Sequence, residues 1–338
     1  CDWSSDVCSS DLAGPAGLMA AEQLAMAGYR VTIYDQMPTP GRKLLIAGRG
    51  GLNLTHSEPL PEFITRYGAA AEWLAPAVHA FPPEALRAWV SEGLGQETFV
   101  GSSGRVFPRS MKAAPLLRAW LLRLQQLGVE YLPRHRWRGW HGDALLFTNA
   151  AGDAVLARPG ATLLALGGAS WPRLGSDGTW TQILAAKQVP LTPLRPANCG
   201  FVVPWSDYFA SRFAGAPLKP LSITHGGLTR QGEAVVTATG LEGGVIYALS
   251  TPLRDAVEAS GTADVTLDLR PAMPLAALTQ KLGTARGNKS LSSYLRSAGF
   301  SPLAVALLRE TTPPEQLAGM SASTLAARLK ALPLRLTA

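Results

Sequence analysis

The chain has 338 residues, a length that suggests two domains or one large domain with an insertion. Apolar residues make up 47% and charged residues only 16%, which excludes intrinsic disorder because disorder requires low hydrophobicity and high charge. No uncharged apolar run approaches the roughly 20 residues of a membrane span, and no secretory signal opens the chain. We therefore expect a soluble, cytoplasmic, globular protein with no membrane partner.

The sequence contains no pattern typical of a metal centre or a nucleophilic triad. Its three cysteines, Cys1, Cys8 and Cys199, include no Cys-x-x-Cys pair, which excludes a zinc ribbon and a redox-active dithiol. The five histidines show no metal-ligand spacing, so no metal is expected. We interpret Cys199 as a small buried apolar side chain.

Both ends of the chain depart from a regular pattern. Residues 1–12 (CDWSSDVCSSDL) are rich in Ser and Asp, and we interpret them as a non-native leader outside the fold. The first strand of the domain that follows is then missing. At the other end, residues 332–335 stop soon after a helical pattern without a closing strand. We therefore expect the chain to be a fragment.

A strand–helix–strand pattern begins at residue 13. The letters AGPAG lead into a helical pattern over 18–27, which Gly28 ends, and residues 29–35 alternate as a strand. This is the dinucleotide fingerprint G-x-G-x-x-G with an acidic residue about 20 positions on, except that Leu12 occupies the first glycine position.

Each position of the fingerprint has a physical role. Gly14 would let the backbone approach a pyrophosphate, and Gly17 would let the helix pack closely on the sheet. Asp35 would accept hydrogen bonds from the adenosine ribose hydroxyls. On this motif alone, a glycine-rich helix start that binds no ligand stays open as an alternative.

Two more glycine-rich segments favour a bound nucleotide. Residues 41–51 hold four glycines and three cations, a composition that suits a loop lying against a flat or phosphorylated ligand. Residues 161–168 (ATLLALGG) have a buried-strand pattern that ends in a double glycine. Ligands of open α/β sheets lie beyond the carboxyl ends of strands, which is where this double glycine would stand.

Together, the segments AGPAGLMAAEQLAMAGYRVTIYDQ, GRKLLIAGRGGLNLTH and ALGGASWPRLGSDG resemble a known family. The chain is similar, from residue 13 to its end, to the YhiN-like (BaiN-like) FAD-dependent oxidoreductases; GSSGRVFPRSMKA and TGLEGGVIYALS match as well. The resemblance implies an α/β fold, in which an FAD-binding Rossmann-like domain of the two-dinucleotide-binding flavoprotein type carries an inserted β-barrel-like and helical part.

The resemblance also implies positions for FAD contacts. The pyrophosphate would lie at Gly14, Pro15, Ala16 and Gly17, and the ribose at Asp35; the flavin side would follow Arg42, Lys43, Gly50, Gly51 and Asn53, and Gly167 and Gly168 would end a strand that passes the FAD. Family members close the flavin domain with a C-terminal glycine-rich segment, and no segment here matches it. The expected fragment would therefore lack part of the FAD contacts.

The remaining pattern divides the chain. Several short β-branched segments between residues 191 and 270 suggest a small β-barrel or sandwich, and from residue 274 the pattern turns helical. We therefore place an incomplete FAD-binding domain at 13–194, an inserted β-rich domain at 195–272 and the helical part of the insert at 273–338.

The expected chemistry follows from the cofactor, because the flavin ring carries the hydride or electrons. We expect an FAD-dependent oxidoreductase acting between a small organic substrate and NAD(P)H or dioxygen. No second G-x-G-x-x-G stands between residues 178 and 338, so reduced nicotinamide would dock transiently over the flavin or not be used. His56 is a candidate proton donor near the flavin; its alternative role is that of a hydrogen-bonded loop residue.

An alternative function rests on a basic segment. Residues 101–140 contain eight basic residues and one acid, Glu130, a balance that attracts phosphates. The run Arg134-His135-Arg136-Trp137-Arg138 interleaves cations with an aromatic ring able to stack on a base, which favours an RNA-associated flavoprotein or a non-catalytic phosphate- or nucleotide-binding module. The spacing of residues 115–128 weakens this alternative, because it predicts an amphipathic helix whose arginines face solvent. We therefore rank a nucleic-acid partner below a small-molecule substrate.

Overall fold

The computed structural model describes residues 7–10, 13–48, 50–284 and 286–338. Leu12, at the fingerprint's first glycine position, lies outside these residues. The chain divides into two compact units, residues 1–194 and 195–338. The division falls between residues 194 and 195, where the sequence analysis set its own boundary. None of the helices in the described ranges combines the length and apolar character that a bilayer crossing requires.

A parallel four-stranded sheet lies at the centre of the first unit, in the order β10-β1-β2-β6. Its strands are β1 (Val7–Ser10), β2 (Val31–Asp35), β6 (Glu130–Pro133) and β10 (Ala161–Leu164). The helix α1 (Pro15–Met26) connects β1 to β2. Pro15 begins this helix, and Gly28 follows it with a left-handed φ of 89°. The predicted strand–helix–strand unit is thus confirmed.

The expected absence of a first strand is wrong. Residues 7–10 form β1, which pairs in parallel with both β2 and β10, Val7 standing opposite Val31 and Ala161. A ladder is made by backbone N–H and C=O groups, and those of β2 and β10 need partners on their facing edges. A four-residue extended segment therefore suffices to complete the sheet. The non-native origin of residues 1–12 stays a prediction.

Helices and two small antiparallel sheets complete the first unit. The sheets are β3-β5-β4 (Thr55–His56, Arg105–Pro108, Thr98–Val100) and β7-β8-β9 (Arg136–His141, Ala144–Thr148, Ala154–Ala157). The helices after α1 are α2 (Arg42–Ala47), α3 (Leu60–Thr65), η1 (Gly68–Ala70), α4 (Ala71–Ala80), α5 (Pro83–Ala88), η2 (Trp89–Gly93), α6 (Ala113–Gln126), η3 (Pro172–Leu174) and α7 (Trp180–Ala185).

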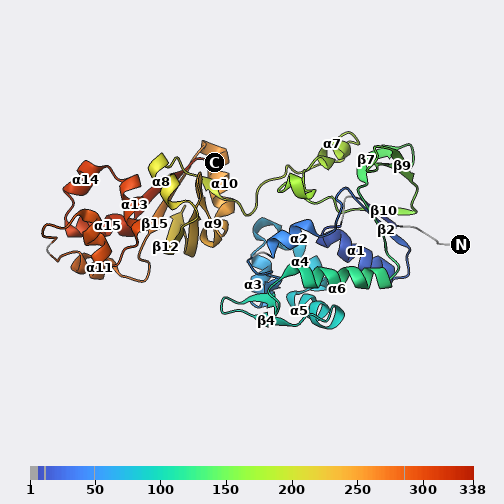
Figure 1. The fold of residues 1–338 in the computed structure, drawn as a ribbon, viewed down its shortest axis with the longest axis horizontal. Coiled ribbons are helices and arrows are strands. Elements are labelled where there is room, and N and C mark those ends of the chain that lie inside the picture. Colours follow the sequence, from blue (N-terminus) through green and yellow to red (C-terminus); the bar gives the residue numbers. More distant parts are fainter. Residues whose placement is uncertain (1–6, 11–12, 49, 285) are drawn as a thin grey trace. The chain divides into compact units, whose positions relative to one another are not determined.

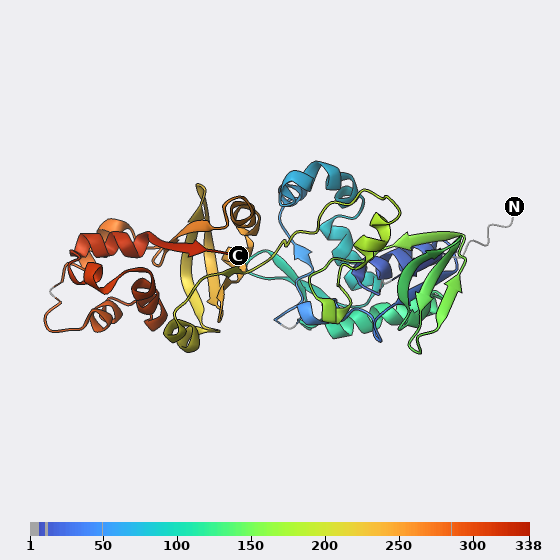
Figure 2. The same ribbon diagram turned by 90° about the horizontal axis from the view of Figure 1, so that it is seen from above.

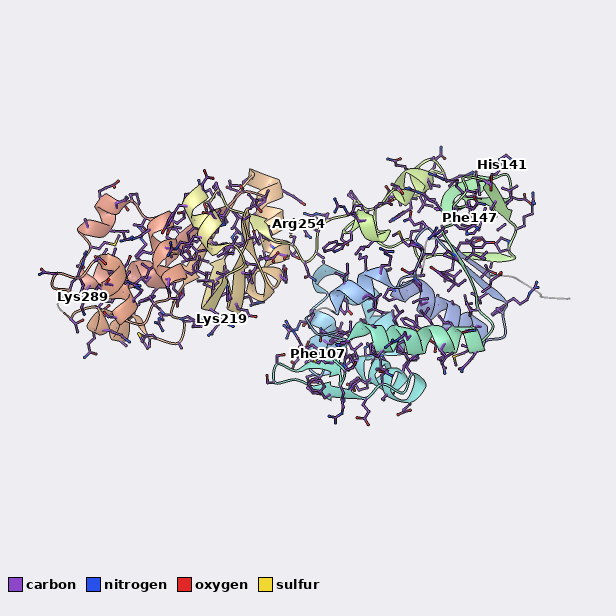
Figure 3. All side chains as sticks on the ribbon, in the orientation of Figure 1. Phe107, His141, Phe147, Lys219, Arg254 and Lys289 are labelled. Carbon is purple, nitrogen blue, oxygen red and sulfur yellow. The ribbon has the colours of Figure 1, made fainter. Side chains whose placement is uncertain are left out.

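The predicted amphipathic helix is α6, which lies beside α1 (Figure 1). Its apolar face buries Leu117, Trp120 and Leu124 in a core shared with α1 and β2. A second cluster lies under the β7-β8-β9 sheet, where the buried Phe147, labelled in Figure 3, stacks on Tyr34 of β2 with ring centres 4.2 Å apart. The small sheet is thereby packed against one end of the parallel sheet.

The second unit contains a curved antiparallel sheet in the order β11-β14-β13-β12-β15-β16. Its strands are β11 (Phe201–Val202), β12 (Pro217–His225), β13 (Leu228–Val236), β14 (Gly240–Glu242), β15 (Ala263–Asp268) and β16 (Leu332–Leu336). The N–H of Val202 donates to the Ala338 carbonyl, and the N–H of Thr337 donates to the Val202 carbonyl. These bonds bring the residues just after β16 against β11, at the opposite end of the strand order, which confirms the predicted barrel-like part.

The expectation that the C-terminus lacks a closing strand is wrong. Residues 332–336 form β16, which pairs with β15. Leu332, Leu334 and Leu336 are buried while Pro333 and Arg335 are exposed, which is the alternation of a strand with one face on the core. Pro333 lies in β16, the last strand in the pairing order, where a residue without a backbone donor is tolerated.

The helices of this unit are α8 (Asp207–Phe213), α9 (Gly244–Tyr247), α10 (Ser250–Ser260), α11 (Leu275–Lys281), α12 (Leu291–Ser297), α13 (Pro302–Thr311), α14 (Pro314–Ala318) and α15 (Ala322–Lys330). Helices α11 to α15 gather at one end of its sheet, where their orange-to-red ribbons are clear in Figure 2, whereas α9 and α10 lie at the other side of the sheet in Figure 1. One hydrophobic core includes buried side chains from the strands, such as Leu267, and from the helices, such as Leu307 and Leu329.

Candidate functional site

A cavity of about 370 Å³ lies among the segments that follow β1, β2 and β10. Its volume falls within the roughly 300–1,000 Å³ of small-molecule and cofactor sites. The lining residues are Ala13, Gly14, Pro15, Ala16, Asp35, Met37, Thr39, Gly41, Arg42, Lys43, Leu44, Ala47, Ala165, Leu166, Gly167, Leu174, Gly175 and Ser176. The chain leaves β1 toward β2 on one side while β10 lies on the other, so the cavity occupies the position where open α/β sheets bind ligands.

The N-terminus of α1 opens into this cavity. Gly14 is its N-cap residue, with φ −82° and ψ 172°, a backbone conformation that any residue adopts. A Cβ added at Gly14 would meet no atom within 4 Å. Nothing in the described protein around this position therefore requires a glycine, whereas a ligand lying against the backbone would. The first turn of α1 also presents N–H groups without helical partners, which suit a phosphate.

Gly17 has a different role from Gly14. It is buried within α1 and does not line the cavity. Its position fits the packing role that the sequence assigned to it, in which the missing side chain lets the helix lie close to the sheet. Pro15 and Ala16, between the two glycines, both line the cavity.

Asp35 ends β2 and lines the cavity with a side chain that is only 6% exposed. Its Oδ1 accepts from the Met37 N–H at 2.9 Å, and its Oδ2 accepts from the Tyr131 hydroxyl at 3.3 Å. Burial raises the pKa of Asp35, and these two hydrogen bonds partly offset that rise. Burial also raises the pKa of Tyr131, so this hydroxyl remains a donor. Asp35 is thus a buried acceptor facing the cavity.

Gly41 is a site residue that the sequence analysis did not single out. It stands in the left-handed region at φ 65° as the N-cap of α2, and its N–H donates to the Ala13 carbonyl at 2.6 Å. An added Cβ would come within 2.6 Å of Leu117 Cδ2. Both the backbone angle and the close packing on α6 require glycine here. In the sequence, the only local indication of this role is that Gly41 directly precedes two cations, Arg42 and Lys43.

Lys43 connects α2 to the loop after β10. Its Nζ donates to Ser170 Oγ at 2.8 Å and to Ser176 Oγ at 3.2 Å. Ser176 is 4% exposed and lines the cavity, as do Lys43 and its neighbour Arg42. The two cations predicted at residues 42 and 43 therefore lie on the same cavity as Asp35.

The double glycine after β10 contributes one residue to the cavity. Gly167 lines it with a left-handed φ of 67°, and Gly168 does not line it. Gly175 lines it as well, with φ 90°, and was not predicted. Of the predicted flavin-side residues, Gly50, Gly51 and Asn53 lie outside the cavity. Gly51 instead has a left-handed φ of 114°, and a Cβ added there would lie 2.6 Å from Met111 Cε, so the backbone itself requires glycine at this position.

His56 also lies outside the cavity. Its Nδ1 accepts from the Glu58 N–H at 3.1 Å, and its Nε2 lies 3.0 Å from the Ser103 carbonyl. With Nδ1 as acceptor, Nε2 carries the proton and donates to that carbonyl. Both nitrogens are thus held by backbone, which favours the alternative of a hydrogen-bonded loop residue. Among the described residues, no three His, Cys, Asp or Glu side chains gather as metal ligands.

The basic segment of residues 101–140 is partly neutralised by carboxylates of the same protein. Arg109 pairs with Glu97 at 2.8 Å, Arg123 with the buried Glu22 at 2.7 Å and Arg136 with Asp177 at 3.0 Å. The expectation that Trp137 can stack on a base is wrong, because its side chain is 2% exposed within the core under the β7-β8-β9 sheet. Alternation along β7 turns this ring inward and its arginine neighbours outward.

Two family descriptions match the chain. Residues 12–259 match the HI0933-like protein Rossmann domain, which covers more than half of the chain, and residues 195–338 match the HI0933-like protein barrel and H2TH domain. The chain belongs to the HI0933-like family. This confirms the resemblance to YhiN-like (BaiN-like) flavin-dependent oxidoreductases, and with it the Rossmann-like domain and the half-barrel with helices.

Two curated proteins and a solved structure are similar to this HI0933-like chain. The 3-dehydro-bile acid delta(4,6)-reductase of Clostridium scindens is 24% identical over 280 residues, 80% of this chain and 66% of the relative. The ribosomal RNA dihydrouridine synthase of Haemophilus influenzae is 47% identical over 49 residues, 14% of this chain and 12% of the relative. The structure of 3-ketosteroid-delta4-(5alpha)-dehydrogenase from Rhodococcus jostii RHA1 is 12% identical with a TM-score of 0.47, covering 98% of this chain and 82% of that one. The chain thus spans less than two thirds of the length of either curated relative.

Proposed function

We propose that the first unit binds FAD and that the chain is an FAD-dependent oxidoreductase. The observation that carries the proposal is Gly14, an N-cap glycine that faces the cavity although the surrounding protein leaves room for a side chain. Asp35 and Lys43 border the same cavity, and they offer an acceptor for ribose hydroxyls and a cation for phosphates.

The protein's own part in this chemistry is binding and orientation. FAD, when bound, supplies hydride transfer through its isoalloxazine ring. The N–H groups of the first turn of α1 would hold the pyrophosphate, and Asp35 would hold the ribose. Lys43, fixed by two serine hydroxyls, would keep its charge beside the phosphates at no further cost in side-chain ordering.

The names of the two relatives support a more specific substrate chemistry. A 3-dehydro-bile acid carries a ketone, and a delta(4,6)-reductase acts on carbon–carbon double bonds; dihydrouridine is uridine with two hydrogens added across the double bond next to a carbonyl. Both products follow from addition of a hydride and a proton across a double bond conjugated with a carbonyl. We therefore propose that this chain reduces a double bond of that kind in a small organic substrate.

A second candidate substrate is RNA. It is favoured by the 47% identity over 49 residues to a ribosomal RNA dihydrouridine synthase. The basic segment of residues 101–140 offers it less support than its sequence suggested, since three of its arginines are paired with carboxylates and Trp137 is buried.

The experiment is an absorbance spectrum of the full chain after incubation with FAD and gel filtration. We expect bands near about 375 and 450 nm, as for a protein-bound flavin. Gly14→Val should weaken FAD binding by about tenfold or more, because the added side chain fills the space that the ligand needs. The matched control is Gly319→Val, at another glycine with open space and an ordinary φ of −95°, which should bind FAD like the unchanged chain.

A protein that remains colourless, or a Gly14→Val variant that binds as well as Gly319→Val, would contradict the proposal. The electron donor is tested on the same sample. Rapid loss of the flavin band on mixing with NADH or NADPH supports transient docking of reduced nicotinamide, and no loss with either would overturn the reductase chemistry.

A further inference from the structure

The helical end of the second unit, where Figure 3 labels Lys289, carries a hollow of about 280 Å³ between α8, α12 and α13. Each helix contributes one arginine to it: Arg212 from α8, Arg296 from α12 and Arg309 from α13. Helix α13 contacts both other helices, and Figure 1 shows it near α8. The hollow therefore lies among helices that pack on one another within the second unit.

The three positive charges of this hollow outnumber the single acid in its lining. Among the described residues, none of its three arginines forms an ion pair with a carboxylate. The one acid in the lining, Glu310, accepts hydrogen bonds from the Ser206 N–H and hydroxyl, and so holds the start of α8. Three guanidinium groups gathered around one hollow repel one another, and an anion with several oxygens would relieve that repulsion.

The basic surface extends beyond a single anion. Arg309 also borders a neighbouring hollow of about 440 Å³, whose lining includes Arg286 and the start of α14. One small phosphate would occupy only part of such a surface. A chain of phosphates, in contrast, would meet a cation in each hollow.

An aromatic ring lies beside these cations. Tyr208 stands one turn before Arg212 on α8, lines the same hollow and is 66% exposed. The Arg212 guanidinium lies 5.9 Å from the centre of its ring. An exposed ring next to phosphate-binding cations is the arrangement by which proteins hold single strands, because every base has a face to stack while its phosphate meets an arginine.

We propose that this hollow binds a single-stranded segment of nucleic acid, with phosphates at Arg212, Arg296 and Arg309 and a base stacked on Tyr208. The proposal deepens the second candidate function, since it supplies in the second unit the stacking ring that Trp137 does not supply in the first. It does not depend on a bound flavin.

The test is fluorescence anisotropy of a labelled, mixed-sequence RNA of about 15 nucleotides with the full chain in low salt. Arg309→Gln should weaken binding about eightfold at about 50 mM salt and lower the salt slope by about 0.7, the effect of one lost phosphate contact on a single strand. Tyr208→Ala should weaken it at least about fivefold with little change in slope, and Tyr208→Phe should keep it, because stacking needs the ring and not the hydroxyl.

The matched control is Arg230→Gln, which removes the same charge from an exposed position on β13, away from the hollow. It should change binding less than twofold. Equal binding of DNA of the same sequence also fits, since arginine and a stacking ring do not read the 2′-hydroxyl. The proposal is overturned if RNA does not bind in low salt, if Arg230→Gln weakens binding as much as Arg309→Gln, or if polyglutamate displaces RNA while Tyr208→Ala has no effect.

The flavin spectrum of the same protein separates the two conclusions. A chain that binds FAD but not RNA retains the proposed oxidoreductase function and loses this inference. A chain that binds RNA through Arg309 and Tyr208 but takes up no FAD keeps the inference and loses the proposed function.

Discussion

The protonation state of Asp35 should make ligand binding at the candidate site depend on pH. Its carboxyl is buried, and burial raises its pKa above the usual value of about 4. Because the folded-state pKa is the higher one, ionised Asp35 disfavours the folded chain once the pH rises through that pKa. Ribose hydroxyls would donate to the ionised form and lower the pKa again. Binding of FAD and loss of the proton from Asp35 therefore favour each other.

We expect the affinity for FAD to fall as the pH is lowered through the raised pKa of Asp35, with the fall beginning above about pH 4. Asp35→Asn should weaken binding about tenfold or more at neutral pH, since hydrogen bonds to a charged group are the stronger ones, and should flatten this pH dependence. Titration calorimetry between about pH 5 and 8 measures the affinity of each variant for FAD and its change with pH. Asp143→Asn, at an exposed aspartate, is the control. An Asp35→Asn variant with the unchanged chain's pH profile would refute the linkage.

At the scale of secondary structure, one buried carboxylate joins three elements of the first unit. Glu22 of α1 is fully buried, and its oxygens accept from the indole N–H of Trp89 in η2 at 3.0 Å and of Trp120 in α6 at 2.7 Å. Arg123 of α6 pairs with it at 2.7 Å. This arrangement holds α1 in place, and with it the helix N-terminus that faces the cavity.

Glu22→Ala should therefore lower the free energy of unfolding by about 3–5 kcal/mol, because it leaves a partly buried guanidinium and two indole N–H groups without their acceptor. Urea denaturation followed by tryptophan fluorescence measures the change. Glu72→Ala, at an exposed position on α4, should alter the stability by less than about 0.5 kcal/mol. A cost for Glu22→Ala as small as that of the control would show that the buried network contributes nothing.

For the molecule as a whole, each unit has its own hydrophobic core. The clusters around Leu117 and Phe147 consist of residues before 195, and the cluster around Leu267 consists of residues after it. A ligand of the first unit should therefore stabilise that unit alone. At about 100 times its dissociation constant, FAD would add about 2.7 kcal/mol to the unit that binds it.

Differential scanning calorimetry should accordingly resolve two transitions, of which FAD raises only one. Glu22→Ala should lower the transition that FAD raises. Leu267→Ala should lower the other one, since deleting a buried leucine side chain costs about 2–5 kcal/mol. A single transition that responds to FAD and to both substitutions would mean that the units unfold together.

The sequence by itself determined the elements whose signals are local. The helix α1 with its proline start and glycine stop, the strand β2 ending at Asp35 and the buried face of α6 all follow from the spacing of neighbouring side chains. A small β-barrel or sandwich followed by helices was also predicted, because strands and helices differ in the period of their apolar side chains. The fingerprint likewise identified Gly14 and Asp35, and the family resemblance identified Lys43; the structure brings all three to one cavity.

Only the tertiary structure decided which residues meet. Strand β1 exists because two distant strands leave a gap with unpaired backbone groups, and β16 exists because β15 offers it an edge. The burial of Trp137 and the gathering of arginines around Tyr208 depend in the same way on elements far apart in the chain. Periodicity and propensity act over a few residues, whereas pairing, burial and electrostatic fields are set by neighbours in space, and no local pattern specifies those neighbours.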